Sequence, residues 1–306
     1  MSASAASARA FAPAKVNLFL HVGAPTADGY HPLSSLMVFA DVGDTLRLLP
    51  APRGAGLGLH VAGEFAGALA GEAASDNLVL RGVRRLLQRA GRPEPDVQFV
   101  LDKALPVAAG LGGGSSDAGA ALRLARAAFA PEVDDAGMEA VAAELGADGP
   151  ACLRAAPVLG LGRGDELRPA PRLPALHAVL VNPRVACPTG AVYRAYDAAA
   201  AFGGAEPAAL EDGASSEDLF SALAVARNDL EAPAIGVAPV IAHVLEALRT
   251  RPEVALAHLS GSGATAFGLC RSAGDAEAAA LALAADPRGW WVRATRLGGP
   301  WSAEGT

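Results

Sequence analysis

Four glycines fall within five residues of this chain, at Gly110 and at positions 112–114. They lie between a short β-rich segment and an alanine-rich segment with helical spacing. A turn from strand to helix needs only one or two glycines, and each further glycine costs conformational entropy on folding. The first turn of a helix offers unpaired N–H groups and positive dipole charge, and Ser115 and Ser116 add hydroxyls. The segment 106–117 therefore predicts a cradle for phosphate oxygens, with a plain glycine turn as the alternative.

The segment does not match the best-known phosphate loops. A Walker A loop places a lysine directly after a glycine, and neither lysine of this chain does so. The dinucleotide pattern G-x-G-x-x-G would put its third glycine at Ser115, and no acidic strand end follows about 20 residues later. The H-R-D and D-F-G motifs of protein kinases are also missing. The sequence thus indicates a phosphate loop of another type.

Composition excludes several classes of protein. A chain of 306 residues with 52% hydrophobic and 19% charged residues suggests about two domains and excludes wholesale disorder. A net charge of -7 argues against a general nucleic-acid or membrane-surface binder. Three scattered cysteines argue against a disulfide framework and a structural zinc site. No apolar run reaches the length of a membrane span, and the first ten residues resemble a frayed tail rather than a signal peptide. We expect a cytoplasmic protein that binds no membrane and no nucleic acid.

Lysine is rare in this chain. Of the 25 Lys and Arg residues, only Lys15 and Lys103 are lysine. Compositional drift towards arginine explains the scarcity. The two lysines are present either by chance or because their positions need a compact ammonium instead of a planar guanidinium.

Periodicity predicts a mixture of helices and strands without regular alternation, which favours an α+β fold over a doubly wound α/β fold. We expect strands over 11–22, 36–49 (with a turn at Gly43 and Asp44), 97–101, 178–182, 266–270 and 290–295. We expect helices over 77–90 (with Asp76 as N-cap), 115–129, a further stretch to about 145, 189–199, 218–226, 237–249 and 275–285. Loops are expected at 260–264 and over the low-complexity segment 200–216, which we expect to be mobile. The Gly- and Pro-broken region 151–172 is the expected boundary, giving domains 1–162 and 163–306.

The first expected strand carries polar residues among apolar ones. Alternation places Lys15, Asn17 and Phe19 on one face and Val16, Leu18 and Leu20 on the other. A buried lysine without a partner is costly, and an ion pair with Asp148 would offset that cost. Asp148 lies in a Gly-Ala-Asp-Gly-Pro turn, where a short carboxylate can be aimed at a substrate. The alternatives are an Asx turn or helix cap for Asp148, and an edge lysine with its head in water for Lys15.

Three segments together resemble the motifs of the GHMP kinases. They are 12–20 (APAKVNLFL), 106–116 (PVAAGLGGGSS) and 259–268 (LSGSGATAFG), and the resemblance covers nearly the whole chain. It implies a two-domain α+β fold, with an N-terminal ATP-binding domain like ribosomal protein S5 domain 2 and a ferredoxin-like C-terminal domain. It also implies an ATP-dependent phosphotransferase with an alcohol acceptor.

Further segments resemble one branch of that family. They are 28–33 (DGYHPL), 146–150 (GADGP) and 228–231 (NDLE). That branch phosphorylates the 2-hydroxyl of methylerythritol linked to cytidine diphosphate, in the non-mevalonate route to isoprenoid precursors. Gly149 departs from the family pattern, which more often has Val there, and we expect it to loosen the backbone beside Asp148.

The resemblance assigns roles to individual residues. It implies Lys15 and Asp148 as the catalytic pair. It implies nucleotide binding by Asn77, Lys103, Pro106, Val107, Ala108, Ala109, Gly110, Leu111, Gly112, Gly113, Gly114, Ser115 and Ser116. It implies acceptor binding by Asn17, Tyr30, His31, Thr189 and Tyr193, with helix packing as the alternative for Tyr193. Mg²⁺ is expected with ATP, without assigned protein ligands, although Ser116 would lie near it.

Two other functions stay open at this point. One is a GHMP kinase for a different small alcohol, such as mevalonate or homoserine. The other is a nucleotide-binding regulator without transferase activity, which the intact loop and the retained Lys15 and Asp148 disfavour. Either a monomer or a homodimer is expected.

Overall fold

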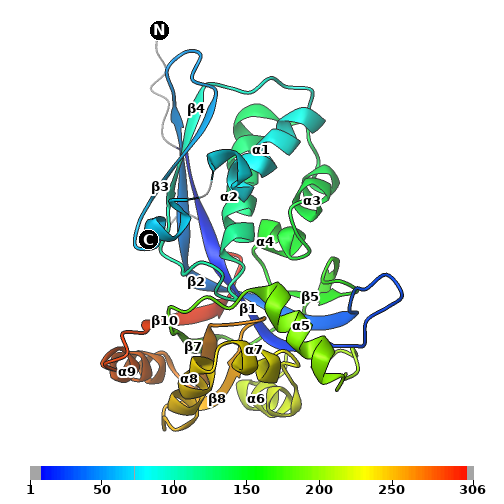
Figure 1. Ribbon diagram of the computed structural model, residues 1–306, viewed down its shortest axis with the longest axis vertical. Helices are drawn as coiled ribbons and strands as arrows, with labels where there is room; N and C mark the ends of the chain where they lie inside the picture. The colour runs from blue at the N-terminus through cyan, green and yellow to red at the C-terminus, as the bar shows by residue number, and fades with distance from the viewer. Residues whose placement is uncertain (1–7, 72, 302–306) are drawn as a thin grey trace.

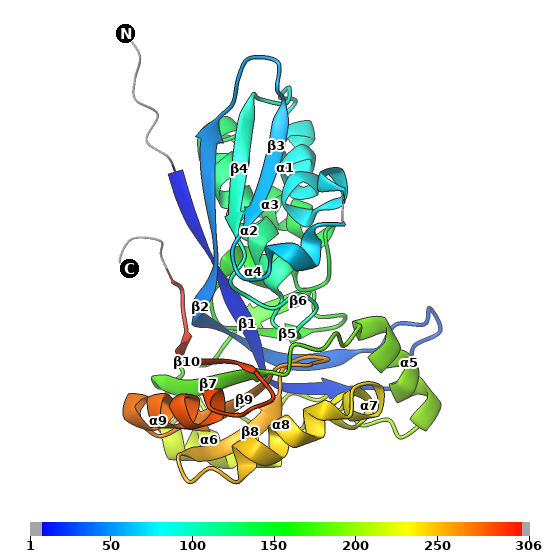
Figure 2. The same ribbon diagram turned by 60° about the vertical axis from the view of Figure 1, so that its left-hand side comes forward.

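The computed structural model describes residues 8–71 and 73–301. Its strands form one sheet, built around two long antiparallel strands, β1 (Ala8–Val22) and β2 (Leu33–Pro50). Figures 1 and 2 show these two strands running from the upper part of the molecule into the lower part. The first seven residues lie outside the described part. Residues 8–10 already belong to β1, so the expectation of a frayed tail was wrong for them.

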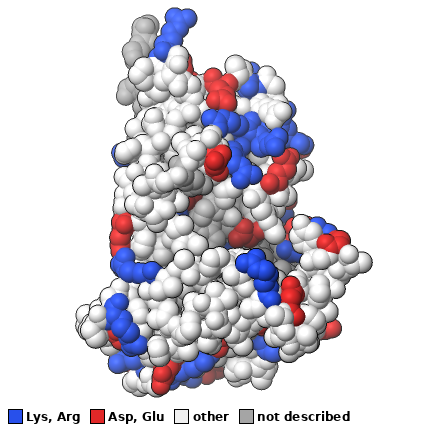
Figure 3. Space-filling view, in the orientation of Figure 1, with Lys and Arg blue, Asp and Glu red and all other residues white. Residues whose placement is uncertain are grey.

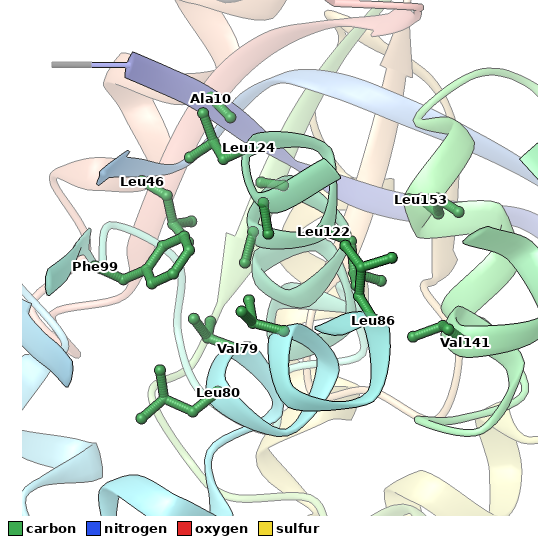
Figure 4. Close-up of a cluster of buried hydrophobic side chains, with 14 of the residues drawn as sticks. Ala10, Leu46, Val79, Leu80, Leu86, Phe99, Leu122, Leu124, Val141 and Leu153 are labelled. Carbon is green, nitrogen blue, oxygen red and sulfur yellow. The ribbon is translucent and has the colours of Figure 1, made fainter. Parts of the chain in front are cut away.

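The upper part places four helices on one side of the sheet (Figure 1). Its elements are β3 (Leu57–Ala62), β4 (Val97–Asp102), α1 (Leu78–Arg89), α2 (Gly113–Phe129), α3 (Asp135–Ala143) and α4 (Gly149–Arg154), with short 3₁₀ turns at Ala66–Leu69 and Ala74–Asp76. In Figure 4, Leu46 and Phe99 from the strands lie on the side of Val79 from α1, and Leu122 from α2 lies beside Leu86 from α1. Burying these apolar side chains fixes the beginning of α2, and with it the glycine loop.

The lower part carries the remaining helices on the other strands of the same sheet. Its elements are β7 (Leu176–Asn182), α5 (Thr189–Ala199), α6 (Ser216–Val225), α7 (Glu231–Val237), α8 (Val240–Arg249), β8 (Val254–Leu259), β9 (Ala266–Cys270), α9 (Ala273–Ala284) and β10 (Trp291–Gly298). A hairpin of β5 (Val158–Leu161) and β6 (Glu166–Pro169) pairs with β2. Since β2 also pairs with β4 and β10, it joins the two parts.

The α+β fold class is confirmed, and so are most of the expected elements. Four strands were missed, namely β3, β5, β6 and β8, and the helix expected over 237–249 is α8, separated from an unpredicted α7. The N-cap of α1 is Asn77 rather than Asp76, and α2 begins two residues earlier than expected. The segment 200–215 has no helix or strand, as expected. The three cysteines are buried and unbonded.

Two corrections concern the long strands. No turn forms at Gly43 and Asp44, because β2 continues through them. A Cβ on Gly43 would lie 2.3 Å from the carbonyl oxygen of Ala12, so this glycine allows two strands to approach closely instead of turning the chain. A register shift after Asn17 also breaks the expected alternation. Phe19 therefore packs in the same core cluster as Val16 and Leu18, and Leu20 packs in a different one.

Neither a membrane-spanning helix nor a metal cluster is found in the described ranges. None of the helices there is both long and apolar enough to cross a membrane. The same residues contain no group of three or more His, Cys, Asp or Glu side chains that could hold a metal ion.

Candidate active site

A cavity of about 630 Å³ opens where the upper and lower parts meet. Figure 3 shows the surface hollowed between these two parts, with charged side chains of both signs interspersed among large uncharged areas. The upper part contributes Lys15, Ser115 and Asp148 to the lining, and the lower part contributes Thr189 and Tyr193. The cavity therefore gathers residues that lie far apart in the sequence.

Lys15 and Asp148 meet in this cavity. Lys15 Nζ lies 3.5 Å from Asp148 Oδ2 and donates a hydrogen bond of 3.0 Å to Asn17 Oδ1. Asn17 in turn donates to Ser35 Oγ at 2.7 Å, and this serine donates to the carbonyl of Phe19. Lys15 is 8% exposed, so the alternative of an edge lysine with its head in water was wrong. Each polar group on this face of β1 has a partner, which makes its burial tolerable.

Asp148 stands at the N-cap position of α4, but its side chain does not cap that helix. Instead, Asp148 Oδ1 accepts a hydrogen bond of 2.7 Å from Ser115 Oγ, and Oδ2 faces Lys15. The capping alternative was therefore wrong, and the carboxylate is directed into the cavity. The expectation for Gly149 was also wrong. A Cβ there would lie 2.0 Å from the carbonyl of Ala142, so close packing of α4 on α3 requires glycine and holds Asp148 in place.

Different structural constraints apply at the four glycine positions of the loop. Gly110 and Gly112 have φ values of +75° and +60°, which favour glycine. A Cβ on Gly110 would lie 2.3 Å from the carbonyl of Ser260, whereas a Cβ on Gly114 would make only ordinary contact, at 3.4 Å from Leu78. Packing against the chain itself thus explains Gly110. At Gly114, which lines the cavity, the protein leaves room for a side chain.

Lys103 belongs to a buried charge cluster. Its Nζ lies 2.5 Å from Asp44 Oδ2 and 2.7 Å from Asp117 Oδ2, and Asp44 Oδ1 accepts hydrogen bonds from the backbone of Ala104 and Leu105. Burial acts to lower the pKa of Lys103, but the two carboxylates outweigh it and raise that pKa. Burial raises the pKa of Asp117 to about 8, and Asp44 acts in the same direction. This cluster ties the N-terminal part of α2 to β2 and to the segment that follows β4.

Most residues expected to bind nucleotide line the cavity, including Asn77, Lys103 and Ser115. The others are Pro106, Val107, Ala108, Ala109, Gly110, Gly112, Gly113 and Gly114. Leu111 and Ser116 are not part of the lining. Leu111 packs in the core, and Ser116 Oγ is buried without a hydrogen-bond partner among the described residues. Asn77 also has a structural role, since its Oδ1 accepts from the backbone N–H of Val79.

The residues expected at the acceptor end separate into two groups. Asn17, Thr189 and Tyr193 line the cavity, whereas Tyr30 and His31 do not. His31 is buried behind Tyr193, with ring centroids 5.4 Å apart, and its Nε2 lies 2.9 Å from Asp197 Oδ1. Burial raises the pKa of Tyr193 to about 12, so this phenol is neutral and suited to stacking.

Sequence reasoning missed three charged residues in or beside the cavity: Asp44, Asp117 and Arg163. Asp44 was interpreted as part of a turn, and Asp117 was noted only as the end of the loop segment. Their signal was the presence of charged residues in segments that are otherwise apolar or rich in alanine, where burial requires a partner. Arg163 lies in a Gly- and Pro-broken region and carried no such signal.

Comparison with known proteins agrees with this geometry. The sequence model described as "GHMP kinases N terminal domain" matches residues 77–155, and "GHMP kinases C terminal" matches residues 205–288. The chain is 57% identical to the 4-diphosphocytidyl-2-C-methyl-D-erythritol kinase of Caulobacter sp. (strain K31), over 95% of this chain and 98% of that protein. The chain belongs to the GHMP kinase family. The enzyme of the same name from Rhodospirillum rubrum is 45% identical, over 93% of this chain and 90% of that protein.

Solved structures place the chain in the same family. A crystal structure of 4-(cytidine 5'-diphospho)-2C-methyl-D-erythritol kinase is 34% identical and matches with a TM-score of 0.76, covering 96% of this chain and all of that one. Homoserine kinase from Cytophaga hutchinsonii matches with a TM-score of 0.68 over 98% and 96% of the two chains. At 19% identity, that second likeness shows the GHMP kinase fold alone.

Proposed function

We propose that this chain transfers a phosphoryl group from ATP to the 2-hydroxyl of 4-diphosphocytidyl-2-C-methyl-D-erythritol. The single observation that carries the chemistry is the contact of Asp148 with both Lys15 and Ser115, at the cavity edge where α2 begins. It joins a carboxylate, a cation and a helix N-terminus, which are the groups that phosphoryl transfer to an alcohol needs. The choice of acceptor rests on the relatives, which bear that substrate in their names.

In this proposal Asp148 is the general base. The acceptor hydroxyl would approach Asp148 Oδ2, the oxygen that faces Lys15. As the hydroxyl oxygen attacks the terminal phosphorus of ATP, its proton passes to the carboxylate and the bond to the bridging oxygen of ADP breaks. Lys15 supplies positive charge beside the attacking oxygen. Ser115 holds the second carboxylate oxygen, so that the base presents a fixed lone pair.

The glycine loop would bind the phosphates of ATP. Gly113 and Gly114 open α2 and line the cavity, so that backbone N–H groups face it at the positive end of the helix. Mg²⁺ would neutralise phosphate charge when ATP brings it. Ser116, the residue expected near such an ion, is buried and does not line the cavity, so no protein ligand is assigned to Mg²⁺. Phosphate and water would supply its ligands.

The cytidine end of the acceptor would lie on the lower side of the cavity. Tyr193 offers an aromatic face there, and Thr189 Oγ1, which is 2.8 Å from Ser262 Oγ, lines the same cavity. We propose that Tyr30 and His31 act from behind this surface. His31 would support Tyr193, because the two rings are in contact.

The remaining expectations also stay proposals. The domain division at 162 and 163 is supported by the two family models, which fall on either side of it. A cytoplasmic location and a monomeric or homodimeric state remain predictions from the sequence.

A phosphorylation assay tests the proposed function. Purified protein is given ATP, Mg²⁺ and each of three acceptors: the cytidylylated methylerythritol, mevalonate and homoserine. We expect turnover only with the first, and a product phosphorylated at the 2-hydroxyl. Fast turnover of mevalonate or homoserine, with none of the cytidylylated compound, would show that the acceptor is wrong. ATP binding without turnover of any acceptor would favour a regulator.

A further inference from the structure

Three residues of α2, spaced four apart in the sequence, contact α4. Ser115 donates a hydrogen bond to Asp148, where α4 begins. A Cβ on Gly119 would lie 2.8 Å from a backbone carbonyl oxygen of α4, so glycine allows the two helices to touch there. Arg123 Nη1 donates to the carbonyl of Leu153 at 2.8 Å, near the end of α4. Residues four apart share one face of a helix, so one face of α2 contacts α4 along its whole length.

The guanidinium of Arg123 also binds β1. Its Nη2 donates to the carbonyl of Phe11 at 2.7 Å, and Phe11 lies four residues before Lys15 on the same strand. Ser115 lies on α2, Lys15 on β1, and Asp148 at the beginning of α4. One guanidinium therefore links the three elements that supply the proposed reacting groups.

The position of α4 decides where Asp148 lies. This helix has six residues and is only about 9 Å long, so it depends on its contacts for stability. Arg123 binds a carbonyl in its last turn, where carbonyls lack partners within the helix, and its charge complements the negative end of the dipole. Fixing this end fixes the direction of α4. It thereby fixes Asp148 at the other end, although Arg123 itself does not line the cavity.

Two arginines nearby have a different environment. Arg126 pairs with Asp135 on the solvent-accessible surface. Arg154 pairs in the same way with Glu139. Ion pairs of this kind contribute little to stability. Arg123 instead donates to backbone carbonyls, and burial lowers the pKa of its guanidinium. A planar guanidinium presents donors in fixed directions, so it can hold two backbone segments at a fixed separation.

We infer that Arg123 is a positioning residue for phosphoryl transfer, which holds α4 and β1 on α2 so that Asp148 and Lys15 stay in contact. The inference rests on the proposed function, because it takes Asp148 as the base, but it does not depend on which alcohol is the acceptor. A misplacement of about 1 Å can slow a reaction by roughly 100-fold. Loss of this guanidinium should therefore slow the chemical step and leave substrate binding intact.

Steady-state kinetics of Arg123→Ala tests the inference, at a temperature well below the melting temperature of the variant. We expect kcat to fall by roughly 10–100-fold, while the KM values for ATP and for the acceptor stay within about threefold. Arg126→Ala is the matched control, because it makes the same change on the same helix and removes only a solvent-accessible ion pair. We expect this control to keep the wild-type kcat.

Added guanidinium gives a second readout. Cavities of about 560 Å³ and 740 Å³ adjoin Arg123, so the ion can reach the place of the missing side chain. At a concentration far below that which unfolds proteins, guanidinium chloride should raise the kcat of Arg123→Ala, whereas sodium chloride should not. Neither salt should raise the kcat of Asp148→Asn. If Arg123→Ala does not fold, Arg123→Lys replaces it, and its kcat should fall at unchanged KM because lysine lacks the planar paired donors.

Several outcomes would overturn the inference. They are a wild-type kcat in the folded variant, a raised KM at unchanged kcat, an equal loss in Arg126→Ala, and a loss in Arg123→Ala that guanidinium does not relieve. Turnover of the cytidylylated acceptor by the wild type would leave the proposed function intact in each case. Turnover of mevalonate instead would change the acceptor, and the same kinetics with mevalonate would then test Arg123. Wild-type protein that phosphorylates no acceptor would overturn both.

Discussion

Ser115 donates a hydrogen bond to Asp148 and thereby joins the first turn of α2 to the beginning of α4. The two residues lie 33 positions apart in the chain, and Asp148 precedes Gly149, a glycine that close packing requires. The phosphate loop and the proposed base are therefore parts of one rigid unit. Substitutions in this unit, or in the buried charge cluster of Lys103 that packs against α2, should affect catalysis and stability to different degrees.

Asp148→Asn should lower kcat by roughly 10²–10⁴-fold, because the amide keeps the shape of the side chain but cannot accept the proton of the attacking hydroxyl. Ser115→Ala is the companion variant, since it leaves the carboxylate and removes only its anchor. We expect a smaller loss of kcat for Ser115→Ala. Steady-state kinetics measures both, with the melting temperature as a folding check. A near-wild-type rate for Asp148→Asn would show that this carboxylate only positions the alcohol.

Lys15→Arg should be poorly tolerated even though it keeps the charge. A Cβ placed on Gly112 would lie only 3.1 Å from Lys15 Cε, so the loop leaves little space beside the lysine stem. A planar guanidinium is bulkier than an ammonium and cannot occupy the same point beside Asp148. We expect kcat to fall about as far as in Lys15→Met. Full activity of Lys15→Arg would contradict this and would attribute the scarcity of lysine to drift.

The buried cluster around Lys103 should make stability depend on pH. Because burial raises the pKa of Asp117 to about 8, the folded protein holds this proton more tightly than the unfolded chain does. The resulting stabilisation is fully present below the ordinary carboxyl pKa near 3.8 and is lost as the pH rises towards 8. Urea unfolding at pH 5, 6, 7 and 8 should show a decline in wild-type stability that is shallower in Asp117→Asn. Parallel curves for the two proteins would contradict the raised pKa.

Lys103→Arg tests the expectation that Lys103 mainly serves nucleotide affinity. Its two carboxylate contacts indicate that this change will also destabilise the fold, by about 1–3 kcal/mol, because the larger head must fit a closed space. Thermal unfolding without ligand measures this, and ATP titration measures the nucleotide effect. If Lys103→Arg were as stable as wild type and only bound ATP more weakly, Lys103 would serve nucleotide affinity alone.

Gly110→Ala and Gly114→Ala form a matched pair within the loop. Gly110→Ala should destabilise the fold by more than about 1 kcal/mol, because its φ is positive and its Cβ would collide with the carbonyl of Ser260. Gly114→Ala should fold normally and weaken ATP binding, because only a ligand would meet the new methyl group. Melting temperature and ATP affinity separate the two effects. If Gly114→Ala bound ATP as wild type does, phosphate would not approach the backbone there.

The sequence predicted local features of the site better than its long-range ones. The neighbours Lys15 and Asn17 could be placed on one face by strand alternation, and the glycine loop could be predicted from its four closely spaced glycines. The role of Asp44 could not be predicted, because its partners Lys103 and Asp117 lie at least 59 positions away and only the sheet brings them together. Phe19 was misplaced because a register shift depends on the pairing of β1 with β2, which the residues of one strand do not encode.

Both lysines of this sequence border the same cavity, and both are buried. The rate of lysine acylation can therefore report on the occupancy of this site. A reagent that modifies lysine must reach the cavity interior, so its rate reports whether the cavity is filled and not how much outer surface is exposed. Protection of Lys15 by an acceptor analogue, or of Lys103 by ATP, could be read peptide by peptide without introducing any label into the chain.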